Sequence, residues 1–191
     1  MQLTSTEREY LLRTARGAIE EHLDARQAER AGAHHEEPPS AQLLEPCGAF
    51  VTLRMPVAGE LRLRGCMGVV VATRPLVESV RDSAVSAAFR DPRFPALTQE
   101  ELEACNIEIS VLSPMMPCTP EEVEPGRDGV MLSYGPASGL LLPQVAVEQG
   151  WDRDTFLSHL CRKAGVGPEC WSDPRAKLHR FTATVFTEEE A

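Results

Sequence analysis

Cys66 stands between Gly65 and Gly68 at the end of an alternating run, and it is the residue best suited to chemistry. Glycine has no Cβ atom, so it permits a positive φ and lets another group approach the backbone. A thiol presented at such a bend could act as a nucleophile, with nearby backbone N–H groups donating to an oxyanion. The alternative is a small buried hydrophobe, the usual role of a free cysteine.

Two other side chains could activate this thiol. Arg64, with Arg62, would stabilise a thiolate at Cys66 if strand alternation survived through Gly65. His159 lies beside the apolar stripe of a predicted helix, where it could serve as the base of a thiol–imidazole pair. Its alternative is a surface histidine near a helix C-terminus, where positive charge is mildly favoured. Nothing in the sequence places the thiol and the imidazole together.

Three further polar side chains are candidates for binding a substrate or a partner. Asp91 and Arg93 flank Pro92 in a turn, where they could bind a carboxylate or form a local ion pair. We favour the ion pair. Gln144 could line a cleft, although a solvated loop is the simpler interpretation. The predicted binding residues are Arg64, Gly65, Gly68, Asp91, Arg93 and Gln144.

The sequence predicts no metal site and no cofactor. There is no C-x-x-C pair, and His34 and His35 are adjacent in a proline-rich segment. His159 and Cys161 are two residues apart on a predicted helix, so they do not share a face. Neither a G-x-G-x-x-G motif nor a Walker lysine occurs.

Composition indicates an ordinary globular protein of 191 residues, with 42% hydrophobic and 25% charged residues. The net charge of −10 disfavours nucleic-acid binding, which depends on neutralising phosphates. No apolar run is long enough to cross a bilayer, and the N-terminus lacks a signal-peptide core. We therefore expect a cytoplasmic protein whose six cysteines are thiols.

Periodicity and capping signals predict interspersed helices and strands. Thr4 with Glu7, and Thr98 with Glu101, are capping boxes that begin two helices. The other predicted helices cover residues 75–88 and 154–164. Predicted strands cover residues 47–55, 61–64 with 69–71, 107–111, 130–134, 139–142 and 178–186.

Hairpins among these strands favour one α+β domain, residues 1–191, with a mainly antiparallel sheet and flanking helices. Residues 32–46 contain Gly32 and three prolines, which predicts an exposed connector. Residues 114–120 are predicted to be a loop, because prolines occur at 114, 117 and 120.

Five segments together resemble the AMMECR-one domain family. They are Leu63-Arg64-Gly65-Cys66-Met67-Gly68, Asp91 to Pro95, Glu108 to Pro114, Leu142 to Ala146, and His159 to Gly165. The resemblance implies two unequal lobes around a cleft that the Leu-Arg-Gly-Cys segment faces. In microbes such domains are similar to component A of the AmmeMemoRadiSam system, alongside Memo-type and radical-SAM proteins. The resemblance implies no particular reaction.

Two hypotheses about function follow from these observations. The first is a protein-interaction or accessory module that works with Memo-type and radical-SAM proteins. The second is a cysteine-dependent hydrolase or transferase, with Cys66 as the nucleophile and His159 as the base. The first is favoured, because a catalytic site normally offers more than one convincing polar group.

Overall fold

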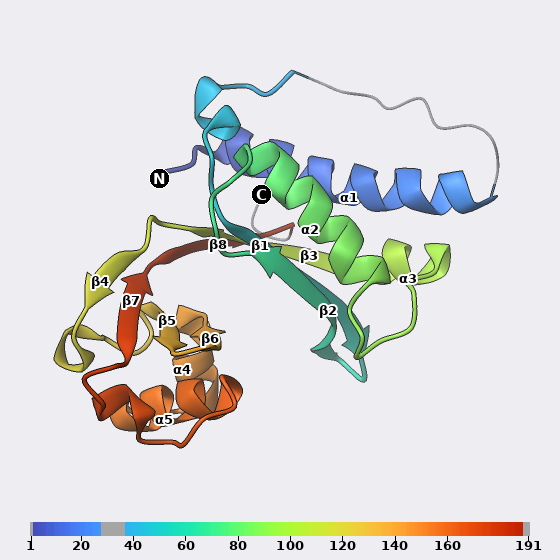
Figure 1. Ribbon diagram of the computed structural model, residues 1–191. Coiled ribbons are helices and arrows are strands. Elements are labelled where there is room, and N and C mark those ends of the chain that lie inside the picture. Colours follow the sequence, from blue (N-terminus) through green and yellow to red (C-terminus); the bar gives the residue numbers. More distant parts are fainter. Residues whose placement is uncertain (1, 28–36, 189–191) are drawn as a thin grey trace. The chain divides into compact units, whose positions relative to one another are not determined.

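A computed structural model describes residues 2–27 and 37–188 (Figure 1). The chain divides into two compact units: Met1–Leu112 with Thr184–Ala191, and Ser113–Ala183. Each unit has its own antiparallel sheet, which confirms the predicted α+β class with mainly antiparallel strands. Residues 32–36 of the expected connector, including His34 and His35, lie outside the described residues.

The first unit places two long helices against a four-stranded sheet with the strand order β2-β1-β3-β8. The capping box of Thr4 and Glu7 begins its first helix, as predicted. Its elements are α1 (Ser5–Gln27), η1 (Ala41–Leu44), β1 (Ala49–Val57), β2 (Glu60–Val69), α2 (Leu76–Phe89), α3 (Gln99–Ala104), β3 (Asn106–Leu112) and β8 (Ala183–Thr187).

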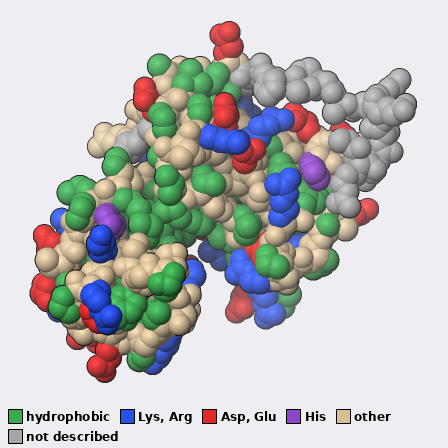
Figure 2. All heavy atoms as spheres, viewed as in Figure 1, with side chains coloured by type: hydrophobic (Ala, Val, Ile, Leu, Met, Phe, Trp, Pro, Cys, Tyr) green, Lys and Arg blue, Asp and Glu red, His purple; other side chains and the backbone are tan. Residues whose placement is uncertain are grey.

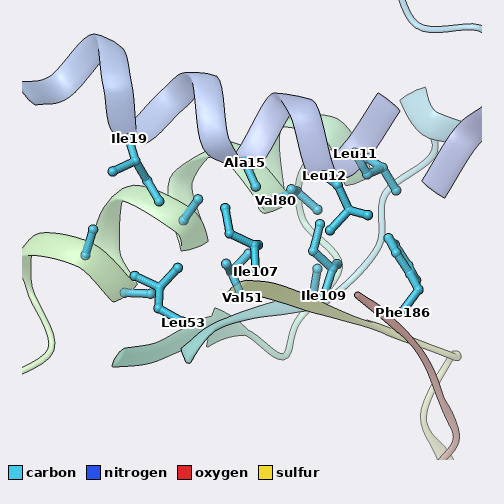
Figure 3. Packing of buried hydrophobic residues seen from close by; sticks show 14 of the residues in the cluster. Leu11, Leu12, Ala15, Ile19, Val51, Leu53, Val80, Ile107, Ile109 and Phe186 are labelled. Atoms are coloured by element: carbon cyan, nitrogen blue, oxygen red, sulfur yellow. The ribbon is translucent and has the colours of Figure 1, made fainter. Parts of the chain in front are cut away.

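The core of this unit lies between the helices and one face of the sheet. Alternation along β1 directs Ala49, Val51 and Leu53 toward the helices, and all three are fully buried. Figure 3 shows Ala15 and Ile19 of α1 above the side chains of β1 and β3. Apolar residues that recur every 3.6 positions along the helices and every second position along the strands therefore pack together in one layer.

Strands β1 and β2 form a hairpin with an irregularity. Its turn is Ala58 and Gly59, both with positive φ, so the two strands extend beyond the predicted ranges 47–55 and 61–64 toward the turn. The register shifts between Leu53, which pairs with Gly65, and Arg54, which pairs with Leu63. Arg64 is therefore the extra residue of a bulge, and alternation does not pass through it unchanged.

The second unit has a sheet with the strand order β4-β7-β5-β6. Its elements are β4 (Met116–Cys118), η2 (Pro120–Glu122), β5 (Gly129–Tyr134), β6 (Ala137–Leu141), α4 (Pro143–Gln149), α5 (Arg153–Lys163), η3 (Cys170–Ser172) and β7 (Lys177–Phe181). Its core includes Phe156, Leu157 and Leu160 of α5. Gly165 follows α5 with φ 76°, as expected for a helix stop.

Two predicted elements in this part of the chain, a loop and a strand, have the wrong boundaries. The proline-rich loop over residues 114–120 contains strand β4, which pairs with β7 although Pro117 lacks a backbone donor. The single strand over residues 178–186 is two strands, β7 and β8, which belong to different sheets and are separated at Thr182. Local patterns did not reveal where the chain changes sheets.

The expectation of six thiols was also wrong. Cys161 and Cys170 form a disulfide that joins α5 to η3, whereas Cys47, Cys66, Cys105 and Cys118 are free. Cys161 lies on the apolar face of α5, against which η3 packs, and this packing brings the two sulfur atoms together. An expectation based on the cellular compartment could not anticipate that contact.

Acidic and basic side chains are interspersed on the face of the molecule seen in Figure 2. Among the described residues, no helix is long and apolar enough to cross a membrane.

A candidate functional site around Cys66

Cys66 lies on β2, the edge strand of the first sheet, opposite Thr52 of β1. The Thr52 hydroxyl donates a hydrogen bond to the Cys66 sulfur at 3.3 Å. The cysteine is half-buried, so it is neither sealed in the core nor fully exposed. This position fits a presented thiol better than the buried hydrophobe considered from the sequence.

Asp91 and Arg93 bind the outer side of the same peptide segment. The Cys66 N–H donates to Asp91 Oδ2 at 2.9 Å, which shows that it points away from β1. Arg93 Nη2 donates to the Cys66 carbonyl oxygen at 3.4 Å. The pair thus occupies one N–H and one C=O at the edge of the sheet, the positions that a neighbouring strand would otherwise take.

The two side chains also bind each other, as the preferred interpretation predicted. Arg93 Nε donates to Asp91 Oδ1 at 2.9 Å, and Nη2 donates to Oδ2 at 2.6 Å. Asp91 is 1% exposed, whereas Arg93 is 54% exposed. Hydrogen bonding to Arg93 holds the pKa of Asp91 far below its usual value, despite the opposing effect of burial. Asp91 is therefore an ionised acceptor fixed beneath an accessible guanidinium.

Arg64 does not serve the thiol as expected. It is buried at the β2 bulge, where Nε and Nη2 donate to the two carboxylate oxygens of Glu101 at 2.9 and 2.7 Å. Glu101 also completes the predicted capping box with Thr98 at the start of α3. The hydrogen bond from Arg64 lowers the pKa of Glu101. Arg64 therefore ties β2 to α3 instead of activating Cys66.

Gly65 and Gly68 are required by close packing rather than by a bend. Neither has a positive φ, so the expected turn at Cys66 is wrong and the strand continues through it. A Cβ atom on Gly65 would lie 2.2 Å from the Ala87 carbonyl oxygen of α2. A Cβ atom on Gly68 would lie 2.4 Å from the Phe50 ring. The glycines thus let helix α2 and an aromatic ring approach β2.

Sequence reasoning missed a polar row across three strands. Thr52 pairs with Cys66 on one side and with Glu108 of β3 on the other. Glu108 in turn accepts a hydrogen bond from Arg54 Nε at 3.2 Å. The alternation of polar residues along β1 was a usable signal, but only the strand register shows that a thiol, a hydroxyl and a carboxylate share one row.

His159 and Gln144 belong to the second unit, whereas Cys66 belongs to the first. His159 lies at the edge of the buried face of α5, as predicted, and its ring stacks on Trp151 at a centroid distance of 3.9 Å. This stacking gives His159 a structural role, and its pairing with Cys66 stays a prediction. Gln144 lies in helix α4, so the solvated-loop interpretation was wrong.

The second unit has a hollow beside Tyr134 and Arg175 and another beside Cys118 and Trp171. Cys66 lines neither hollow. Residues 2–27 and 37–188 contain no cluster of three or more His, Cys, Asp or Glu that could hold a metal ion.

Comparisons with known proteins agree with this architecture over nearly the whole chain. A family model described as AMMECR1 matches residues 12–186. A protein of Thermococcus gammatolerans is 45% identical over 188 residues, which cover 95% of this chain and 90% of the relative. Protein MK0488 of Methanopyrus kandleri is 43% identical, with coverage of 99% and 92%. The crystal structure of an uncharacterized protein, PH0010 of Pyrococcus horikoshii, has a TM-score of 0.85 and 42% identity, with coverage of 95% and 91%.

Proposed function

Because this chain belongs to the AMMECR1 family, we propose that it is an accessory module that binds Memo-type and radical-SAM proteins. The binding surface in this proposal is the outer edge of β2. A partner adds an extended segment to the part of that edge before Cys66, whose own N–H and C=O are bound by Asp91 and Arg93. Main-chain hydrogen bonds supply affinity there, and side-chain contacts supply specificity.

One observation carries the proposal: β2 is an edge strand with exposed apolar side chains. It pairs with β1 on one side, and Leu61, Leu63 and Val69 are 45%, 38% and 41% exposed. Edge strands of this kind normally carry features that prevent pairing with another chain. On β2, Asp91 and Arg93 cover the edge at Cys66, while apolar side chains are exposed at both ends of the strand.

The charges beside this edge favour an acidic partner segment. Arg62 of β2 is 63% exposed, and Arg93 is 54% exposed above the buried Asp91. Arg62 lies 4.0 Å from Glu60, which is itself 79% exposed, so that exposed ion pair is weak. An acidic segment along β2 would gain two guanidinium partners.

The test is binding of purified Memo-type and radical-SAM proteins to the full chain, measured by calorimetry. Leu63→Glu and Leu61→Glu remove an apolar contact and place a negative charge beside the acidic partner segment, so each is expected to weaken binding about tenfold or more. Leu44→Glu is the matched control, because Leu44 is 52% exposed on η1 of the same unit. Equal affinities for the wild type and the two edge variants, with unchanged circular dichroism, would refute the proposal.

A cysteine-dependent hydrolase or transferase is the second candidate, and the row of Cys66, Thr52 and Glu108 favours it. The test is labelling of the folded protein with iodoacetamide across pH. Burial raises the pKa of Cys47, and it raises that of Cys105 to about 11. Selective modification of Cys66 below about pH 8 supports this candidate. Modification of Cys66 only after denaturation removes it, and Cys66→Ser is the control.

A further inference from the structure

The Asp-Pro-Arg turn of the first unit occurs a second time in the chain, at Asp173-Pro174-Arg175. Both turns form the same hydrogen bonds. The arginine N–H donates to the aspartate Oδ1 at 2.9 Å in the second turn and 3.1 Å in the first. In the second turn, Arg175 Nε and Nη2 donate to Asp173 Oδ1 and Oδ2 at 3.1 and 2.7 Å. The aspartate therefore fixes the guanidinium in both turns.

The two turns differ in what the fixed guanidinium faces. In the first turn, Arg93 Nη2 reaches a backbone oxygen, the carbonyl of Cys66. In the second turn, Arg175 Nη2 donates to the Tyr134 hydroxyl at 2.5 Å, and the guanidinium lies 5.2 Å from the centre of that ring. The Tyr134 hydroxyl donates onward to Asp173 Oδ2 at 2.8 Å. Nη1 of Arg175 makes no hydrogen bond with the part of the chain that the structure describes.

Alternation places a second cation beside Arg175. Successive side chains of an extended segment point to opposite sides. Ala176 and Leu178 pack against the core of the second unit, whereas Arg175 and Lys177 line a hollow of about 680 Å³. Lys177 is exposed and forms no ion pair with any described residue. Its strand partner Ser133 lines the same hollow.

The other walls of this hollow are mostly apolar. They come from the Tyr134 ring, from the hairpin turn that contains Gly135 and Pro136, and from Val166 after α5. The volume lies within the range of small-molecule sites, which combine apolar walls with a few fixed polar groups.

The geometry points to a binding site for a small organic anion, with its oxyanion between Arg175 and Lys177 and its apolar body against Pro136 and Val166. A carboxylate or a phosphate monoester supplies the oxyanion, because both accept charge-assisted hydrogen bonds from the Nη1 group of Arg175 and from the Lys177 ammonium. The charges of Asp173 and Arg175 offset each other in their ion pair, so Lys177 supplies the net positive charge that attracts the anion. This site lies in the second unit and does not depend on the proposed edge of β2.

The experiment is titration of the ¹⁵N-labelled full chain, followed by NMR. Phenyl phosphate and phenylacetate are the anionic ligands. Inorganic phosphate tests the oxyanion without the apolar body, and benzyl alcohol tests the apolar body without the charge. We expect saturable shifts at Gly135, Val166 and the Arg175 Nε–H with one or both aromatic anions. The one that binds more tightly identifies the oxyanion class. Inorganic phosphate and benzyl alcohol should each bind at least about tenfold more weakly.

Variants test whether the two cations act as proposed. Lys177→Ala should weaken binding about tenfold, because it removes one charged partner of the oxyanion. Arg175→Lys keeps the charge but loses both the Nη1 donor and the paired N–H groups with which Asp173 fixes the guanidinium, so it should also weaken binding. Arg153→Ala is the control, because Arg153 is an exposed arginine of the same unit outside the hollow. The absence of saturable shifts, or an equal loss in the Arg153 variant, overturns the proposal.

Discussion

Replacing Asp91 by Asn tests whether the Asp91–Arg93 pair holds the edge of β2. The carboxylate accepts four hydrogen bonds, two on each oxygen. Oδ2 accepts the Cys66 N–H and Arg93 Nη2, and Oδ1 accepts the Arg93 backbone N–H and Nε. An amide has one oxygen, so its NH₂ group must face donors in either orientation. One backbone N–H therefore loses its acceptor.

The expected loss of stability depends on how deeply these groups are buried. An unsatisfied buried donor costs about 1–3 kcal/mol, and the ion pair adds about 0–1 kcal/mol because Arg93 is 54% exposed. We expect Asp91→Asn to lower the free energy of unfolding by about 2 kcal/mol. The pKa of Asp91 is lower in the folded state than in the unfolded state. The carboxylate therefore stabilises the fold fully at pH values above its unfolded-state pKa, and this stabilisation is lost as the pH falls. The difference between wild type and variant should therefore be constant above about pH 5 and shrink below about pH 4.

Urea denaturation measures this loss, and hydrogen exchange locates it. The Cys66 amide should exchange about 30-fold faster in Asp91→Asn, as a local loss of about 2 kcal/mol requires. Asp173→Asn is the matched control from the second Asp-Pro-Arg turn. Asp173 is 27% exposed and accepts one of its hydrogen bonds from the rotatable Tyr134 hydroxyl. Asp173→Asn should therefore lower the free energy of unfolding by less than Asp91→Asn does. Unchanged exchange at Cys66 in Asp91→Asn would refute this account of the strand edge.

Two further predictions concern the glycines and the disulfide. Gly65→Ala should destabilise the first unit by about 2 kcal/mol or more in urea denaturation, because the added Cβ would lie 2.2 Å from the Ala87 carbonyl. Gly17→Ala, in α1 with nothing within 4 Å, should instead stabilise it by about 0.5–1 kcal/mol, and an equal loss at both positions would contradict the packing argument. Cys170→Ser should destabilise the second unit by about 2–3 kcal/mol, because the bridge joins residues separated by 9 positions. Thermal unfolding of wild type with and without dithiothreitol checks this, and a transition insensitive to the reductant in wild type would count against it.

Local sequence patterns predicted much of the fold. The capping boxes at Thr4 and Thr98 begin helices, and Gly165 ends one. The alternation of Ala49, Val51 and Leu53 produced a buried strand face. These features depend on residues within one or two turns of each other, so the chain encodes them locally. The Asp91–Arg93 ion pair was predictable for the same reason.

The sequence by itself determined the α+β class and the helix boundaries set by caps, and it singled out the Leu-Arg-Gly-Cys segment as a candidate site. Only the tertiary structure decided what the residues of that segment contact. The register of β1 places Cys66 beside Thr52, the bulge directs Arg64 to Glu101, and α2 packs close enough to require glycine at position 65. Each of these contacts joins residues distant along the chain, and such pairings are fixed by the packing of the sheet and helices rather than by local preference.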